Sequence, residues 1–215
     1  MRCKPLLTSA LSIAGAVVAV LSGAASAATV TFTTNNPGTG FGGTSLTLNS
    51  SSGAAATLTY AAAPTATVGT PSNVNYGIFT LACVGCSTQD LGTGATFNAF
   101  TFDLVIQDLN EGGTGKFVGS SAGGTIFSDV SPIMLSWAPT SIGPGTNGTL
   151  SGTFGVSVFS LNGLTGIVAP NSGFMLGQTT VEGVVVENIP VPGSALLTAS
   201  GLALFGLLRR KRPSA

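Results

Sequence analysis

Two cysteines in the pattern Cys-x-x-Cys are the first residues whose types and spacing could do chemistry: Cys83 and Cys86, in "LACVGCSTQ". A redox pair of the thioredoxin kind opens a helix, whereas the flanking residues here alternate as strands do. A structural zinc site needs four ligands, and the chain has no histidine and one further cysteine, Cys3, near its N-terminus. We therefore expect Cys83 and Cys86 to form a structural disulfide, as is common in exported proteins.

Two other motifs resemble catalytic or phosphate-binding loops but lack the residues on which that chemistry depends. In "GSSAG", Ser121 has the nucleophile position of Gly-x-Ser-x-Gly. A serine hydrolase of that kind needs a histidine to deprotonate the serine, so we expect an incidental match. In "GGTGKF", Asn110 stands where a phosphate-binding loop has its first glycine, and Phe117 rather than Ser or Thr follows Lys116. We expect a turn there.

Carboxylates gather in "FDLVIQDLNEGG", where Asp103, Asp108 and Glu111 could serve a glycoside hydrolase or a cation site. A glycosidase needs two carboxyl groups about 5–9 Å apart, and five residues along a strand separate Asp103 from Asp108 by about 16 Å, on opposite faces. Asp108, Asn110 and Glu111 offer the hard oxygen ligands that suit Ca²⁺. However, Gly112 occupies the position of a ligand in an EF-hand loop. We expect a solvated turn, with Ca²⁺ as the alternative, and no cofactor.

Charge is distributed unevenly along the chain. Residues 28–188 carry one cation, Lys116, and seven acids, a net charge of −6, and all other cations lie near the two ends. A nucleic-acid-binding domain needs a basic patch that neutralises phosphates. We therefore expect no nucleic-acid partner. The seven acids are Asp90, Asp103, Asp108, Glu111, Asp129, Glu182 and Glu187.

The first 27 residues have the three parts of a secretory signal peptide. Two cations precede a short apolar stretch, and Ala25 and Ala27 supply the small side chains that signal peptidase accepts at positions −3 and −1. We expect cleavage by signal peptidase after Ala27, which makes Ala28 the new N-terminus of an exported chain.

The end of the chain combines a proline motif, an uncharged run and a basic cluster, in "IPVPGSALLTASGLALFGLLRRKRPSA". Residues 194–208 predict a short transmembrane helix. Its uncharged run from Ala195 to Leu208 has 14 residues, which span about 21 Å as a helix, less than the roughly 30 Å of hydrocarbon in a bilayer. Basic residues favour the cytoplasmic side of a membrane, so the preceding domain is expected to face outward. The basic cluster consists of Arg209, Arg210, Lys211 and Arg212.

This tail resembles the PEP-CTERM sorting signal of exported bacterial proteins. The matching motif is Ile189, Pro190, Val191 and Pro192, a conservative variant of Val-Pro-x-Pro, with Val191 where the family most often has glutamate. The resemblance covers roughly the last 25 residues. It implies that an exosortase, a membrane transpeptidase-like enzyme, cuts near the motif. The product is then released or attached outside the cell, typically in organisms that make exopolysaccharide.

The region between these segments shows short runs of alternating hydrophobic and polar residues, separated by Gly, Pro, Asn and Ser clusters, which indicate strands. In the clearest run, 100–109, one face carries Phe100, Phe102, Leu104 and Ile106. We predict an all-β domain of about nine or ten strands, an antiparallel β-sandwich of the jelly-roll or immunoglobulin-like type, flanked by a signal helix and a transmembrane helix. The expected organisation is a signal peptide at 1–27, the β-domain at 28–188 and a sorting segment at 189–215. The runs comprise residues 29–34, 44–50, 56–61, 75–83, 100–109, 116–120, 124–130, 133–139, 153–161, 165–170 and 179–187.

These features favour a non-catalytic domain at the cell surface or in the extracellular matrix, acting by adhesion or by contact with carbohydrate such as exopolysaccharide. Its processing partners would be signal peptidase and the exosortase. Before cleavage, the C-terminal helix would hold the chain in the membrane. One alternative is an extracellular glycoside hydrolase that depends on carboxylates, since that chemistry needs no histidine. Another is ice-surface binding, which usually involves regular ranks of threonine; "TVTFTT" supplies one such rank.

Overall fold

The computed structural model describes residues 28–41, 45–49, 53–146, 148–170 and 177–187. Within these ranges every assigned element is a β-strand except one 3₁₀ turn, η1 (Gln89–Leu91), so the prediction of an all-β domain is confirmed. The described part of the chain has no helix with the length and apolar character needed to cross a membrane. The expected signal peptide and the transmembrane helix at 194–208 lie outside the described residues.

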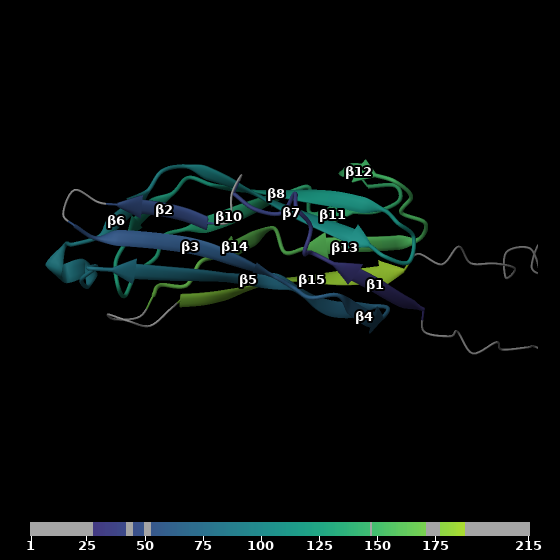
Figure 1. Ribbon diagram of the computed structural model, residues 1–215, viewed down its shortest axis with the longest axis horizontal. Helices are drawn as coiled ribbons and strands as arrows, with labels where there is room; N and C mark the ends of the chain where they lie inside the picture. Colours follow the sequence, from purple (N-terminus) through teal and green to yellow (C-terminus); the bar gives the residue numbers. More distant parts are fainter. Residues whose placement is uncertain (1–27, 42–44, 50–52, 147, 171–176, 188–215) are drawn as a thin grey trace, which may run out of the picture.

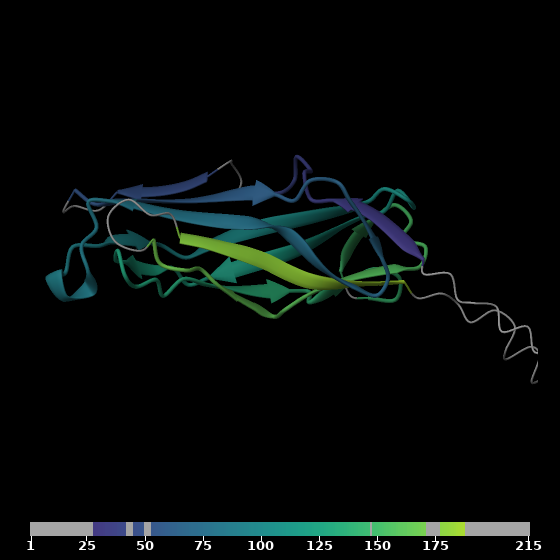
Figure 2. The same cartoon turned by 90° about the horizontal axis from the view of Figure 1, so that it is seen from below.

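The strands form two large antiparallel sheets and one small one, and most of them run along the long axis of the molecule (Figures 1 and 2). Sheet A has the order β14 (Leu164–Gly166), β10 (Met134–Ala138), β8 (Thr114–Ser121), β7 (Phe100–Asp108), β1 (Thr29–Thr33) and β4 (Ala66–Gly69), with β12 (Thr149–Ser151) also paired to β8. Sheet B has the order β11 (Ser141–Ile142), β13 (Ser157–Leu161), β15 (Gly177–Glu187), β5 (Ser72–Val84), β3 (Ala55–Ala62) and β2 (Ser45–Asn49). The small sheet pairs β6 (Ala95–Phe97) with β9 (Gly124–Ile126).

Each run that the alternation indicated overlaps a strand, but the described ranges hold 15 strands, more than the nine or ten that we predicted. The pattern missed β4, β6, β11 and β12, which have two to four residues each. Runs so short hold too few positions to show a period of two, and pairing with longer neighbours makes them strands.

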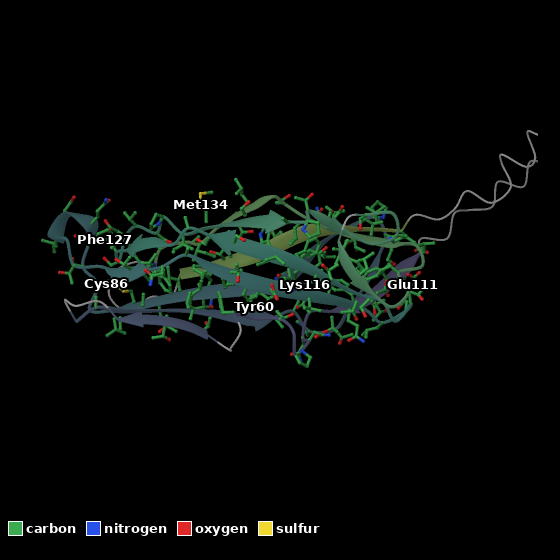
Figure 3. The ribbon with its side chains drawn as sticks, turned by 90° about the horizontal axis from the view of Figure 1, so that it is seen from above. Tyr60, Cys86, Glu111, Lys116, Phe127 and Met134 are labelled. Atoms are coloured by element: carbon green, nitrogen blue, oxygen red, sulfur yellow. A yellow bond between two sulfur atoms is a disulfide. The ribbon has the colours of Figure 1, made fainter. Side chains whose placement is uncertain are left out.

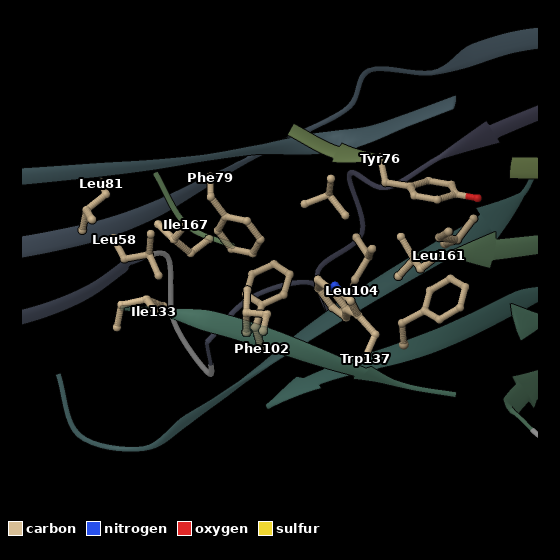
Figure 4. Packing of buried hydrophobic residues seen from close by; sticks show 14 of the residues in the cluster. Leu58, Tyr76, Phe79, Leu81, Phe102, Leu104, Ile133, Trp137, Leu161 and Ile167 are labelled. Atoms are coloured by element: carbon tan, nitrogen blue, oxygen red, sulfur yellow. The ribbon is translucent and has the colours of Figure 1, made fainter. Parts of the chain in front are cut away.

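The core lies between the inner faces of the two large sheets. On β7, Phe102, Leu104 and Ile106 are each 0% exposed, as their shared face predicted. The ring of Phe102 meets that of Phe79 from β5 edge to face, with centroids 4.8 Å apart (Figure 4). An aromatic pair of this kind contributes about 0.5–1.5 kcal/mol beyond the burial of its area. Phe102 also packs against Trp137 of β10, so one side chain joins three strands.

A β-bulge in β5 shapes the middle of sheet B. Gly77 pairs with Val181 and Asn75 pairs with Glu182, which leaves Tyr76 as an extra residue. Gly77 has φ +151°, and a Cβ there would collide with the Tyr60 hydroxyl. The bulge therefore requires glycine at position 77.

The two ends of the domain lie together. Strand β1 begins and β15 ends at the same pole of the molecule, whereas η1 and the loop after β5 lie at the opposite pole (Figures 1 and 2). Ala28 is held at the first pole because its carbonyl oxygen accepts a hydrogen bond of 2.9 Å from the Thr70 N–H. The chain therefore enters and leaves this domain at one side.

Candidate binding surface

Cys83, at the end of β5, and Cys86, in the loop after it, form a disulfide with their Cα atoms 5.8 Å apart. Gly85 lies between them with φ +74°, which lets the chain turn tightly. The Cys86 sulfur lies 3.6 Å from the carbonyl oxygen of Ile126 at the end of β9. Figure 3 shows Cys86 near the pole that is remote from the chain ends. The disulfide therefore closes the tight turn after β5 and lies beside the small sheet.

Ser121 and Lys116 both have structural partners. Ser121 is buried at the end of β8, and its Oγ accepts a hydrogen bond of 3.1 Å from the Gly123 N–H, which stabilises the turn. The Lys116 ammonium lies 3.0 Å from the Asp103 carboxylate, across β7 and β8 on the outer face of sheet A. Because both charges are partly exposed, such a pair contributes little to stability.

Asp108 is fully buried, so the expectation of a solvated turn is wrong at this position. Its side chain follows Ile106 onto the inner face of β7, while Asp103 lies on the outer face, as the spacing predicted. The Asp108 Oδ1 accepts hydrogen bonds from the N–H groups of Asn110 (2.9 Å) and Glu111 (3.3 Å). The carboxylate therefore stabilises the turn between β7 and β8.

Asn110 and Glu111 tie this turn to other segments. The Asn110 amide accepts a hydrogen bond of 3.2 Å from the Thr31 N–H and donates one of 2.7 Å to the Thr29 carbonyl oxygen. The Glu111 carboxylate accepts hydrogen bonds from the N–H groups of Gly155 and Val156.

Asp108 Oδ1, the Asn110 Oδ1 and the Glu111 carboxylate thus accept backbone N–H groups, while Asp108 Oδ2 is buried without a hydrogen-bond partner in the described part of the chain. In the described ranges, no three side chains among His, Cys, Asp and Glu are grouped to hold a metal ion. The hydrogen bonds of Asp108 Oδ1, Asn110 and Glu111 give these three residues a structural role in the turn.

A pocket of about 500 Å³ lies beside the loop that follows β1. Its lining contains carboxamide, hydroxyl and aromatic side chains, and none of the lining residues is an acid or a base. Residues that contribute side chains of these kinds are Thr34, Asn35, Asn36, Thr39, Phe41 and Tyr60. The sequence pattern did not single out this loop, because "TTNNPGTGF" reads as an ordinary turn until its partner strand is known.

Two threonines hold the loop in place. Thr34 Oγ1 donates a hydrogen bond of 2.7 Å to the Tyr76 carbonyl oxygen and accepts one of 2.9 Å from the Ala63 N–H. Thr39 Oγ1 accepts a hydrogen bond of 3.0 Å from the Val105 N–H. Beyond Thr39, Gly40 makes an isolated bridge to Asp103 of β7. Both ends of the loop are therefore fixed to strands.

Aromatic side chains form the inner wall of the pocket. Phe41 packs against Phe102 with ring centroids 4.8 Å apart, and Tyr60 packs against the same ring at 4.7 Å. The Tyr60 hydroxyl donates a hydrogen bond of 2.5 Å to the Tyr76 carbonyl oxygen. Burial raises the pKa of the Tyr60 hydroxyl well above its ordinary range. The wall is therefore rigid and uncharged at neutral pH.

Comparison with protein-family models, with curated proteins and with solved structures gave no match for this chain.

Proposed function

We propose that this chain is an exported, exosortase-processed bacterial protein of the cell surface or extracellular matrix, whose β-domain binds neutral polysaccharide without catalysing a reaction. The observation that carries this proposal is the uncharged pocket beside residues 34–41, where carboxamides and hydroxyls lie next to aromatic rings. Sugar hydroxyls pair with amide and hydroxyl groups, which can both donate and accept. The apolar C–H face of a sugar ring packs on aromatic side chains.

The proposed export route comes from the two ends of the chain. Residues 1–27 supply the signal peptide and residues 189–215 the sorting segment. Because the described domain begins and ends at one pole (Figure 2), a C-terminal membrane helix would hold it by that pole before processing. The sheet faces and the opposite pole would remain accessible to a polymer.

For the fold, we propose a β-sandwich of the jelly-roll or immunoglobulin-like type. Antiparallel pairing between the neighbouring strands of the described ranges supports this class. Aromatic contacts such as that between Phe79 and Phe102, which join sheet B to sheet A, support the sandwich arrangement.

The binding proposal is tested with protein isolated from the native host and the host's own exopolysaccharide, with a polyanionic polymer for comparison. We expect binding to the neutral polymer, and a three- to tenfold loss of affinity in Asn35→Ala, since one lost hydrogen bond is worth about 0.5–1.5 kcal/mol. Asn98→Ala is the matched control, because Asn98 is also exposed but does not line the pocket. Equal affinity of the Asn35 and Asn98 variants would exclude the pocket as the binding site.

The processing proposal is tested by intact mass of the protein from membrane and culture fractions separately. A species that starts at Ala28 and ends near Pro192, outside the membrane, supports the sorting signal. A membrane species that still carries Arg209 to Arg212 would make the tail a permanent anchor.

A second candidate function, ice-surface binding, has one observation in its favour. On sheet B, Thr47 pairs with Thr57 and Thr59 pairs with Thr80, so hydroxyl side chains repeat across neighbouring strands. Inhibition of ice recrystallisation by the purified protein would support this function over polysaccharide binding.

A further inference from the structure

Three polar side chains lie side by side on the outer face of sheet B. Asn75 on β5 pairs with Glu182 on β15. Asn162 directly follows Leu161 of β13, whose partner on β15 is Gly183. Neighbouring strands lie about 4.8 Å apart, so the three side chains extend over about 10 Å. We call Asn162, Glu182 and Asn75 the Asn–Glu–Asn row.

The row lines a hollow of about 430 Å³, together with Asn73 and Val184. All four polar side chains of this hollow are exposed, although they come from strands whose inner faces are buried. The hollow offers carboxamides and one carboxylate and contains no cation. It therefore suits a ligand rich in hydroxyl groups and repels an anionic one.

The bulge in β5 holds the row in position from beneath. The extra residue, Tyr76, points into the core and is 0% exposed. Its hydroxyl lies 3.2 Å from the Ser160 carbonyl oxygen on β13 and 3.3 Å from that of Val184 on β15, and donates to these acceptors. One buried side chain thus links the three strands that carry the row. A site on strands fixed in this way loses little freedom when a ligand binds.

The bulge also orients one amide. The Gly77 N–H donates a hydrogen bond of 2.7 Å to Asn75 Oδ1. With its oxygen engaged, Asn75 offers its NH₂ group as a donor, while the neighbouring Glu182 carboxylate can only accept. A donor beside an acceptor matches two adjacent sugar hydroxyls, one accepting and one donating.

A second hollow of about 350 Å³ adjoins the first, and the two share Asn73, Val74 and Asn75. It lies where the chain leaves β3 for β4, and its lining is mainly aliphatic: Ala62, Ala63, Ala66, Val68 and Ile78 contribute to it. An apolar hollow beside a polar row fits a sugar that carries a small apolar substituent, such as the methyl of an acetyl group.

We propose that the Asn–Glu–Asn row is a second glycan-binding site, which takes the hydroxyl groups of a neutral sugar while the adjoining hollow takes its acetyl methyl. This inference rests on the proposed function in taking polysaccharide as the ligand, but it uses residues that do not line the pocket beside residues 34–41. It names acetylated neutral sugars as the preferred class.

The test measures binding of the full-length or naturally processed protein to two probes by calorimetry: oligomers of N-acetylglucosamine and oligomers of glucose of equal length. We expect at least fivefold tighter binding of the acetylated oligomer. The double variant Asn162→Ala/Glu182→Ala should lose about tenfold in affinity for it, and Glu182→Gln should lose less. Asn98→Ala is the control, and equal melting temperatures establish that the variants are folded.

The outcomes separate this inference from the proposed function. If the double variant binds the acetylated oligomer as the wild type does, the row is not a site. If Asn35→Ala alone removes all binding, the pocket beside residues 34–41 is the site and this inference fails while the proposed function stands. If neither oligomer nor the host polymer binds, both fail. Binding that disappears with a chelator would assign the row to a cation and would also overturn the inference.

Discussion

The Tyr60 hydroxyl donates a hydrogen bond to the Tyr76 carbonyl oxygen, and Thr34 Oγ1 donates a second one to the same atom. This carbonyl therefore joins β3, β5 and the loop that borders the proposed glycan pocket. It lies at the bulge, where the regular ladder between β3 and β5 ends at the pair Ala62 and Gly77. The pocket beside residues 34–41 and the Asn–Glu–Asn row thus share one buried support.

Removing the Tyr60 hydroxyl should destabilise the domain less than removing the Thr34 hydroxyl. Tyr60→Phe leaves the carbonyl bonded to Thr34, so we expect a loss of about 0.5–1.5 kcal/mol in the free energy of unfolding. Thr34→Val removes two hydrogen bonds, the one that Thr34 Oγ1 donates to the Tyr76 carbonyl oxygen and the one that it accepts from the Ala63 N–H, so we expect about 1–3 kcal/mol. Urea denaturation measures both values. A Thr34 variant as stable as the Tyr60 variant would contradict this account of the support.

The stability of the domain should depend on pH in the alkaline range. Burial raises the pKa of Tyr60 from its ordinary value of 10.0, and that of Tyr76 likewise. A group whose pKa is raised on folding contributes stability that is complete below the unfolded pKa and is lost as pH rises above it. We expect unfolding free energy to fall above about pH 10, and to fall less steeply in Tyr60→Phe. If the unfolding free energy falls equally steeply with pH in the wild type and in Tyr60→Phe, Tyr60 does not contribute to this pH dependence.

Gly77→Ala should be among the most damaging small substitutions in the chain. The methyl group would meet the Tyr60 hydroxyl and the Ala61 carbonyl oxygen, in a backbone conformation that favours glycine. We expect a loss of more than about 2 kcal/mol, measured by thermal denaturation. Gly69→Ala is the control, since nothing lies within 4 Å of a Cβ at that position. Similar melting temperatures for the two variants would show that the bulge tolerates a side chain.

Glu111→Ala should loosen the turn between β7 and β8 and the segment before β13. The Glu111 carboxylate accepts hydrogen bonds from the N–H groups of Gly155 and Val156. Hydrogen bonds to a charged group contribute about 1.5–3 kcal/mol to the free energy of unfolding. Hydrogen exchange at those two amides should accelerate in the variant. Asp90→Ala, at an exposed position, should change stability by less than about 0.5 kcal/mol. Unchanged exchange at Gly155 and Val156 would contradict the role of Glu111.

Reduction of the disulfide should have a modest effect. A closed loop of four residues gives about 2 kcal/mol on the chain-entropy model. We expect a reducing agent to lower the melting temperature by several degrees and to leave the domain folded, because the core lies between the large sheets. The double variant Cys83→Ala/Cys86→Ala should melt at the temperature of the reduced protein. Its melting temperature should be the same with and without the reducing agent. Complete unfolding on reduction would mean that the disulfide holds the core together.

Local patterns in the sequence determined several features of this protein. The alternation along residues 100–109 predicted both the strand β7 and its buried face, because a period of two is a property of neighbouring residues alone. The spacing of Asp103 and Asp108 predicted that they lie on opposite faces for the same reason. The spacing of Cys83 and Cys86, and the concentration of cations near the chain ends, likewise need no knowledge of the fold.

Strand pairing decided the rest. Asn75 and Glu182 are far apart in the sequence, and a single bulge at Tyr76 brings them opposite each other. The loop after β1 becomes the edge of a pocket only because Tyr60 arrives beside it from another strand. Asp108 is buried although its turn is polar, because Asn110 and Glu111 tie that turn to β1 and to the segment before β13. Registers and bulges depend on the partner strand, and no local pattern records which strand that will be.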